Sequence, residues 1–388
     1  MKRGIALFAL IVIIVLAGFL FLNFKLSDYD GIQNNLENSN IKFIERNREV
    51  EAAFEPINCP TVQRHWDENS YNGPMIDTHI HIPAIPDSPS EKIDEDEKHP
   101  FMGFNVRIDD YICMMDYENT SKVFAFFPVW DPIINESIEI VSKTLEKHSG
   151  RFVPFIMPPY HDDRKDGYPT VDAETLTEML NLSNGIFKGY GEIGLYERGD
   201  HGGPKGAKAL PPDSSRLLEI YPIIRENNLL VYFHLGEGQK ESFERILEQN
   251  PDINFIWHGD QLVTHESERQ NLSQVEDILY NHPNAYYGVD QLYGNVWLIK
   301  PGVSKKEFIN HFENYGPLLE KDIQTWKGFI ERHPDQVLWG TDRGWSEPWS
   351  LDPEVALTLN NYSRTFIGKI DSSAREKFAY KNAEKLIA

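Results

Sequence analysis

Two histidines, His79 and His81, stand one residue apart at the end of an apolar run that begins at Met75. Alternate side chains of a β-strand point to the same face, so both imidazoles face the same way if this run is a strand. Two imidazoles on one face form half of a metal site, because neutral imidazole is a common ligand of divalent ions. Asp77 could orient one of these histidines or approach the ion itself.

Four further residues that could bind a metal follow later apolar runs, each at the C-terminal end of its run. They are Glu192, His234, His258 and Asp342. All these candidates offer nitrogen or oxygen donors, which suit Zn²⁺ or Mn²⁺, and none offers sulfur. The full set exceeds what one tetrahedral ion needs. Either two ions share a bridging carboxylate, or one ion takes part of the set and the remaining residues do acid–base work.

The chemistry expected of such a site is hydrolysis, because a bound divalent ion lowers the pKa of its water toward about 7. Asp342 is expected to take the proton of that water as general base and to pass it to the leaving group. His258 is expected to ligate a second ion or to polarise the substrate. Arg343 could bind an anionic group of the substrate or form a salt bridge at the rim. A carboxylated Lys188, which shares the parity of Glu192, is a weaker alternative as a bridging ligand.

These residues need a scaffold that gathers the ends of several strands, and strand-like and helix-like patterns alternate from residue 75 onward. The predicted strands are 75–82, 122–129, 151–157, 187–195, 229–235, 254–258, 285–289 and 337–341. The predicted helices are 108–116, 133–148, 173–182, 214–227, 240–248, 272–280, 305–332 and 353–367. Eight strands, each followed by a helix, predict an α/β fold, a (β/α)₈ TIM barrel of parallel strands. The active site of such a barrel lies at the C-terminal ends of its strands, where every metal-ligand candidate falls.

Several of these motifs together resemble the amidohydrolase superfamily of metal-dependent barrel hydrolases. The resemblance is carried by Asp-x-His-x-His at 77–81, the histidines that end the fifth and sixth predicted strands, and Gly-Thr-Asp at 340–342. The closing Asn-Ala-Glu-Lys-Leu at 382–386 is similar to the ending usual in the amidohydrolase-related branch. The resemblance covers about residues 75–388 and implies a small-molecule substrate and a divalent metal cofactor.

The motifs of this sequence resemble two branches of the superfamily, which imply different numbers of metal ions. The amidohydrolase-related branch implies one metal, with His258 acting on the substrate. The ligands implied there are His79, His81, His234 and Asp342. Gly-Glu-Ile-Gly around Glu192 instead resembles the metal-dependent deoxyribonuclease branch, in which that glutamate helps to hold two metals. One or two ions of zinc or manganese are therefore expected.

The reaction also has alternatives. The first expectation is a hydrolase acting on an amide, ester, lactone or phosphoester. The second is a metal-dependent non-oxidative decarboxylase on the same scaffold, in which Asp342 would protonate carbon. A non-catalytic binding barrel is the third, and the presence of every expected ligand argues against it.

Size and charge set wider bounds on the chain. Its 388 residues suffice for a barrel of roughly 250 residues with insertions. The net charge of −22 repels nucleic acid backbones, so no nucleic acid partner is expected. The sequence leaves the oligomeric state open.

The N-terminal part of the chain predicts a membrane anchor. Residues 4–24 carry no charge and, as a helix, are long enough to cross a hydrocarbon core of about 30 Å. The length of this run and the lack of Ala-x-Ala near its C-terminal end favour an uncleaved single-pass anchor over a cleaved signal peptide. Lys2 and Arg3, which precede the run, favour an orientation with the catalytic barrel outside the cytoplasm. Residues 25–70 would form a polar stalk and residues 71–388 the barrel. Cys59 and Cys113 could form one disulfide between stalk and barrel or remain two thiols.

Overall fold

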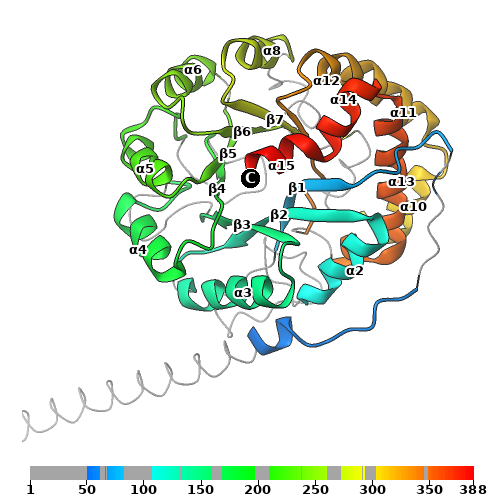
Figure 1. Ribbon diagram of the computed structural model, residues 1–388, viewed down its shortest axis with the longest axis horizontal. Coiled ribbons are helices and arrows are strands. Elements are labelled where there is room, and N and C mark those ends of the chain that lie inside the picture. Colours follow the sequence, from blue (N-terminus) through cyan, green and yellow to red (C-terminus); the bar gives the residue numbers. More distant parts are fainter. Residues whose placement is uncertain are drawn as a thin grey trace, which may run out of the picture. The chain divides into compact units, whose positions relative to one another are not determined.

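Eight parallel strands stand side by side in chain order, with helices outside them (Figure 1). The strands are β1 (Met75–His81), β2 (Thr120–Pro128), β3 (Phe152–Met157), β4 (Gly189–Gly194), β5 (Leu230–His234), β6 (Phe255–His258), β7 (Ala285–Val289) and β8 (Val337–Trp339). This computed structural model describes residues 50–61, 66, 68–82, 107–131, 133–159, 168–196, 209–236, 238–259, 272–290, 292, 303–344 and 348–388. The predicted α/β barrel of eight parallel strands is confirmed.

The last strand meets the first through a short seam of backbone hydrogen bonds. The N–H of Asp342 donates to the carbonyl of His79 at 2.9 Å, and the N–H of His81 donates to the carbonyl of Arg343 at 2.7 Å. Ile80 and Arg343 form an isolated parallel bridge at the same place. The seam brings the two edge strands together just beyond the end of β8, so the C-terminal ends of β1 and β8 are neighbours.

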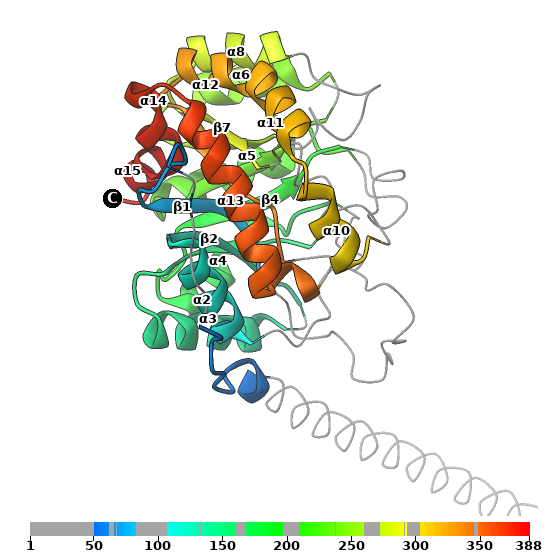
Figure 2. The ribbon, with the colours of Figure 1, turned by 90° about the vertical axis from the view of Figure 1, so that its right-hand side faces the viewer.

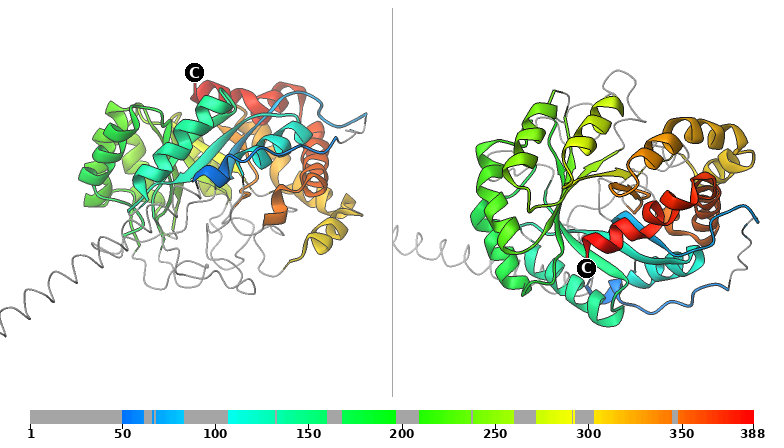
Figure 3. Two further views of the ribbon diagram at one scale, coloured as in Figure 1. Left: turned by 90° about the horizontal axis from the view of Figure 1, so that it is seen from below. Right: turned by 45° about the horizontal axis from the view of Figure 1, so that its top comes forward.

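Helices cover the outer face of the strands, as Figure 3 shows from two further directions. The longer helices are α2 (Ile108–Glu118), α3 (Ile134–Lys147), α4 (Ala173–Ser183), α5 (Ser215–Glu226), α6 (Lys240–Gln249), α8 (Leu272–Asn281), α10 (Lys305–Phe312) and α13 (Pro353–Lys369). The shorter elements are α11 (Gly316–Asp322), η1 (Ile323–Lys327), α12 (Gly328–Arg332), η2 (Pro348–Leu351), α14 (Ser372–Glu376), η3 (Lys377–Lys381) and α15 (Asn382–Leu386).

One predicted helix is divided in the structure. The sequence predicts a single helix over 305–332, whereas α10 ends at Phe312 and α11 begins at Gly316. Pro317 lies in the first turn of α11. Proline disfavours helical backbone at the residue before it and lacks an N–H for the helix interior, so a new helix starts there.

Local sequence explains how α4 begins, ends and packs. The Asp172 side chain accepts a hydrogen bond from the N–H of Thr175 at 2.8 Å and caps the first turn. Asn184 adopts a left-handed conformation and ends the helix. Leu176 and Met179 are buried on one face, at helical spacing. The cap and the apolar face together set α4 against the strands.

Aromatic side chains fill the interior of the barrel below the strand ends. The Phe126 ring packs 4.8 Å from Phe155 and 5.1 Å, edge to face, from Tyr232. Ala383 of α15 belongs to the same buried cluster. Figure 1 shows α15 crossing the barrel axis, and Figure 2 places α14 and α15 at the end where β1 starts. The filled interior and this covered end leave the C-terminal ends of the strands to present a site.

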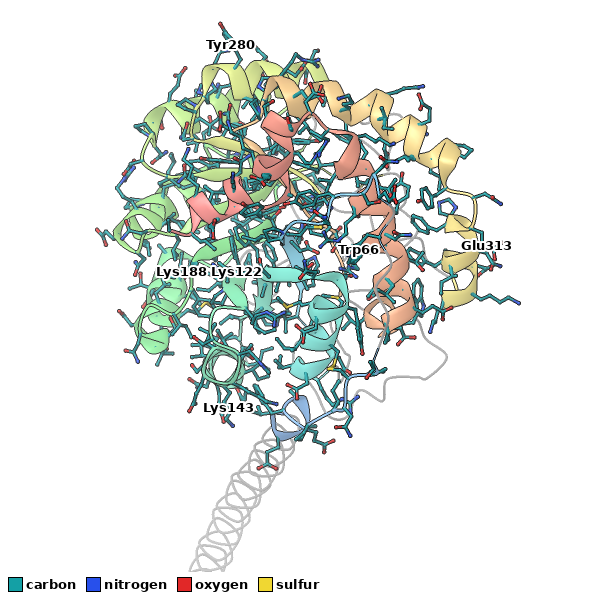
Figure 4. The ribbon with its side chains drawn as sticks, turned by 45° about the vertical axis from the view of Figure 1, so that its right-hand side comes forward. Trp66, Lys122, Lys143, Lys188, Tyr280 and Glu313 are labelled. Atoms are coloured by element: carbon teal, nitrogen blue, oxygen red, sulfur yellow. A yellow bond between two sulfur atoms is a disulfide. The ribbon has the colours of Figure 1, made fainter. Side chains whose placement is uncertain are left out.

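Arg364, on α13, ties the chain that precedes β1 to the barrel. Its buried guanidinium donates to the carbonyls of Tyr71 and Gly73, both at 2.9 Å, and to that of Glu118 at 2.7 Å. Trp66, labelled in Figure 4, lies with its ring centroid 4.5 Å from the guanidinium carbon. Trp66 falls within the predicted stalk, so this part of the stalk packs on the barrel.

The predicted single-pass membrane location is contradicted. Crossing a bilayer takes about 20 apolar residues in one helix. Within the described part of the chain, no helix is both long and apolar enough for this. Residues 4–24, the predicted anchor, lie outside that part. We withdraw the membrane location and the placement of the barrel outside the cytoplasm, while the stalk boundary at residue 70 stays a prediction.

Cys59 and Cys113 are joined by a disulfide, which decides between the two alternatives that the sequence left open. Cys113 lies on α2 and is buried. The two cysteines are 54 residues apart in the chain. The bond therefore closes a long loop that includes all of β1.

Replacing both cysteines, Cys59→Ala/Cys113→Ala, should lower the free energy of unfolding by about 2–4 kcal/mol, because the bond limits the conformations of the unfolded chain. Urea denaturation followed by circular dichroism measures the difference. A reducing agent should bring the wild type to the stability of the double variant and leave the variant unchanged. Equal stability of oxidised wild type and variant would contradict the bond.

Candidate metal centre

The residues predicted to bind a metal meet at the C-terminal ends of the strands. His79 Nε2 lies 3.3 Å from Glu192 Oε2 and 3.6 Å from Asp342 Oδ1. His81 Nε2 lies 3.0 Å from the same oxygen of Asp342 and 3.5 Å from Glu192 Oε2. Residues from β1, β4 and the end of β8 therefore share one small volume.

A second group of side chains adjoins the first through Glu192. His234 Nε2 contacts Glu192 Oε1. The His234 ring stacks on the His258 ring, with the centroids 3.9 Å apart. His258 Nε2 lies 3.7 Å from Asp342 Oδ2. One oxygen of Glu192 thus faces the two histidines of β1, and the other faces the histidine of β5.

The site fits a divalent metal ion on three observations. His79 is fully buried, and among the described residues neither of its ring nitrogens has a hydrogen-bond partner. Donor atoms within 4.8 Å of one another form three overlapping groups: His79, His81, Glu192 and Asp342; Glu192, His234 and His258; His79, His258 and Asp290. All donors are nitrogen or oxygen, which suits Zn²⁺ or Mn²⁺. The expectation of a divalent metal cofactor is confirmed.

At His79, Glu192 and Asp342, attraction between opposite charges outweighs the effect of burial on the pKa values. Burial lowers the pKa of His79, but Asp342, Asp290 and Glu192 outweigh it and hold that pKa well above its usual value. Burial raises the pKa of Glu192, yet His234 and His79 hold it well below its usual range. The pKa of Asp342 is likewise lowered, because the attraction of the histidines outweighs burial. The carboxylates of Glu192 and Asp342 are therefore ionised at neutral pH.

An irregularity in β1 turns its two histidines inward. The pairing register between β1 and β2 shifts between Asp77 and Ile80. Ile76 packs in the barrel interior, and strict alternation from it would send His79 and His81 outward. The shift reverses the alternation, as bulges beside active sites commonly do. Both imidazoles therefore reach the interior.

A similar irregularity in β4 presents Glu192. The register with β5 shifts between Tyr190 and Ile193, and both of these side chains pack in the core on the helix side of the sheet. Gly191 makes this possible, because a Cβ there would lie 2.4 Å from the carbonyl oxygen of Tyr232. Lys188, labelled in Figure 4, is exposed before the start of β4. The parity argument for a bridging Lys188 is therefore wrong.

Asp77 fixes the turn that carries Asp342. Its carboxylate accepts hydrogen bonds from the Thr341 hydroxyl at 2.6 Å, the Thr341 N–H at 3.0 Å and the His79 N–H at 3.1 Å. Asp342 has a φ of 51°, a left-handed conformation that costs roughly 1 kcal/mol or more. Burial raises the pKa of Asp77 to about 7. Asp77 thus holds the backbone of the ligand residues, rather than an imidazole ring.

Asp290 belongs to the site and was not among the predicted residues. It directly follows β7, and its Oδ2 lies 3.7 Å from His79 Nδ1 and 3.8 Å from His258 Nε2. The Tyr232 hydroxyl donates to the same oxygen at 2.7 Å. The sequence carried a signal, since Asp290 directly follows the predicted strand 285–289, as the other candidates lie at the ends of their strands.

A closed ring of parallel strands with imidazoles and carboxylates buried at its mouth defines a metal-dependent barrel enzyme. The family model described as Amidohydrolase matches residues 76–388, so the chain belongs to the amidohydrolase family. The predicted resemblance to that superfamily is confirmed, and so is the prediction of an enzyme. A comparison with the curated proteins finds no match.

Solved structures are similar to this chain at low sequence identity. An amidohydrolase from Burkholderia multivorans with bound zinc is 12% identical, covers 81% of this chain and 99% of its own, and has a TM-score of 0.49. The dihydroorotase from Campylobacter jejuni is 12% identical, covers 85% of this chain and 86% of its own, and has a TM-score of 0.47. A dihydroxybenzoic acid decarboxylase from Polaromonas sp. with bound manganese is 14% identical, covers 82% of this chain and 97% of its own, and has a TM-score of 0.44.

Arg343 lies behind the metal ligands, within the protein. Its guanidinium donates to both carboxylate oxygens of Glu118, at 2.6 and 2.9 Å, and to the Thr341 hydroxyl at 3.0 Å. Both partners of this ion pair have side chains that are 1% exposed. We therefore do not carry forward the predicted substrate contact of Arg343. The pair instead joins the end of α2 to the turn that carries Asp342.

Replacing Arg343 by methionine should lower the free energy of unfolding by about 3–5 kcal/mol, because Glu118 would remain buried without its cation. The double variant Arg343→Met/Glu118→Gln should recover part of this loss. Urea denaturation of the three proteins measures both steps. A substrate-binding Arg343 would instead leave stability unchanged in Arg343→Met and raise KM.

Proposed function

We propose that the chain is a metal-dependent hydrolase that cleaves an amide, ester, lactone or phosphoester bond of a small molecule with water. Its membership of the amidohydrolase family and the gathered ligand set support this proposal. A divalent ion held by these ligands would act as a Lewis acid and would lower the pKa of a water molecule toward about 7. The protein side chains then have to orient the reactants and move protons.

Asp342 is the general base in this proposal. Its carboxylate takes the proton of the attacking water and delivers it to the leaving group. The side chains of Asp342 and Glu192 are 8% and 9% exposed, whereas that of Asp290 is fully buried. Asp342 and Glu192 both combine a lowered pKa with some access from outside, and Asp342 also lies beside His258. His258, 3.7 Å from Asp342, is placed to polarise the substrate or to ligate an ion.

The position of the Glu192 carboxylate is the single observation that favours two metal ions over one. Its Oε2 faces both histidines of β1, and its Oε1 contacts His234. A carboxylate that presents one oxygen to each of two imidazole groups has the arrangement of a bridging ligand. His79, His81 and Asp342 would complete one position, and His234 and His258 the other.

Two equivalents of zinc per chain are expected after dialysis of the purified protein against excess zinc and removal of unbound metal, as measured by mass spectrometry of the metal content. Glu192→Gln should hold at most one, because the shared carboxylate is lost. Glu276→Gln removes the carboxylate of an α8 residue from an exposed ion pair with Arg332. This variant should still hold two equivalents. One equivalent in the wild type would contradict the bridging role, and none would contradict the proposed function.

Asp342→Asn should lower kcat by about 10²–10⁴-fold, because the amide cannot accept the proton of water. Release of p-nitrophenol from a panel of p-nitrophenyl esters and phosphoesters measures this, with the metal content of each protein determined in parallel. Asp322→Asn, in a buried site of the helical layer, is the matched control. Unchanged kcat in Asp342→Asn would exclude it as the base. Release of CO₂ from hydroxybenzoates without ester turnover would show a decarboxylase instead.

A further inference from the structure

We propose that Asp290 is a positioning residue for His79, and that Tyr232 holds Asp290 in place. The inference rests on the proposed function, because it concerns the same centre. It adds a carboxylate on β7 and a phenol on β5 to the residues that determine how tightly the centre holds its metal.

The burial of Asp290 needs an explanation. Moving a carboxylate out of water costs several kcal/mol unless hydrogen bonds or opposite charges compensate. The Asp290 side chain is fully buried, and the Tyr232 hydroxyl donates to its Oδ2 at 2.7 Å. The imidazoles of His79 and His258 face the same oxygen at 3.7 and 3.8 Å. One carboxylate oxygen thus faces a hydroxyl and two rings that form the metal centre.

Two glycines leave space for this carboxylate. A Cβ added at Gly340 would lie 2.2 Å from Asp290 Oδ1, and a Cβ added at Gly288 would lie 2.4 Å from Oδ2. Any other residue at either position would displace the carboxylate. Gly288 on β7 and Gly340 just after β8 therefore leave open the place that the Asp290 carboxylate occupies.

The two nitrogens of His79 face different groups. Nδ1 faces Asp290, while Nε2 faces Glu192 at 3.3 Å and Asp342 at 3.6 Å. An imidazole that binds a metal through Nε2 carries its proton on Nδ1. A carboxylate on the Nδ1 side stabilises that tautomer, fixes the ring and raises the basicity of the ligating nitrogen.

This geometry favours a positioning role for Asp290 over direct metal ligation. Asp290 lies on the Nδ1 side of His79, away from the nitrogen that faces Glu192 and Asp342. Its Oδ2 already accepts the hydrogen bond of Tyr232, whose ring packs 4.9 Å from His79. Asp290 therefore acts through His79.

The test uses two site variants and two matched controls. Asp290→Asn removes the charge, and Tyr232→Phe removes the hydroxyl that orients it. A second buried Asp–Tyr pair, Asp322 and Tyr362, lies in the helical layer, with a hydrogen bond of 2.5 Å. Asp322→Asn and Tyr362→Phe make the same chemical changes there. Competition with a chromogenic chelator gives the zinc affinity of each full-length protein, and urea denaturation without metal gives its stability.

We expect Asp290→Asn to bind zinc roughly 10–100-fold more weakly than the wild type, with the same stoichiometry. Tyr232→Phe should weaken binding in the same direction and by less. The control variants should lose stability but keep the zinc affinity of the wild type.

Two results would overturn this inference. Wild-type zinc affinity in both site variants would make the Asp290–Tyr232 pair purely structural. Loss of a whole zinc equivalent in Asp290→Asn would make Asp290 a ligand. A wild type that binds no zinc would instead refute the proposed function, so the two failures are distinguishable.

Discussion

The structure depends on keeping ionised carboxylates buried among imidazoles at the mouth of the barrel. Glu192 and Asp342 keep pKa values below their usual ranges although burial alone would raise them. The compensation comes from histidines on three other strands, because parallel strands in a closed barrel end at the same rim. If the positive charge or the metal ion that these carboxylates face were removed, each buried carboxylate would destabilise the folded state by several kcal/mol.

Other parts of the fold keep this arrangement rigid. Register shifts turn the histidines of β1 and Glu192 of β4 inward. Asp77 holds the turn after β8 through its hydrogen bonds to Thr341, and the Arg343–Glu118 pair anchors that turn to α2. Buried side chains therefore hold the backbone at His79 and around Asp342 in place. A site with this support can hold a metal with little reorganisation.

Much of the fold and the ligand set could be predicted from the sequence, because both follow from patterns of residue type along strands. The alternating elements predicted the barrel, and histidines or acids at strand ends predicted the candidate ligands that the structure brings together. Strict alternation failed at Lys188 and did not show the shifts in β1 and β4, because a bulge depends on the neighbouring strand. For Arg343 the structure shows the salt-bridge alternative, buried rather than at the rim, and the sequence could not identify Glu118 as the partner because it lies far away in the chain. Asp290 was missed because a single acid after a strand is typical of a loop.

The most direct test of the central claim is anomalous diffraction at the zinc absorption edge from crystals of the zinc-loaded protein. The account predicts two peaks at the mouth of the barrel, one beside each carboxylate oxygen of Glu192, with Asp290 near neither. A single peak on one side of Glu192 would contradict the bridging carboxylate. The absence of any peak among these histidines would contradict the metal centre itself.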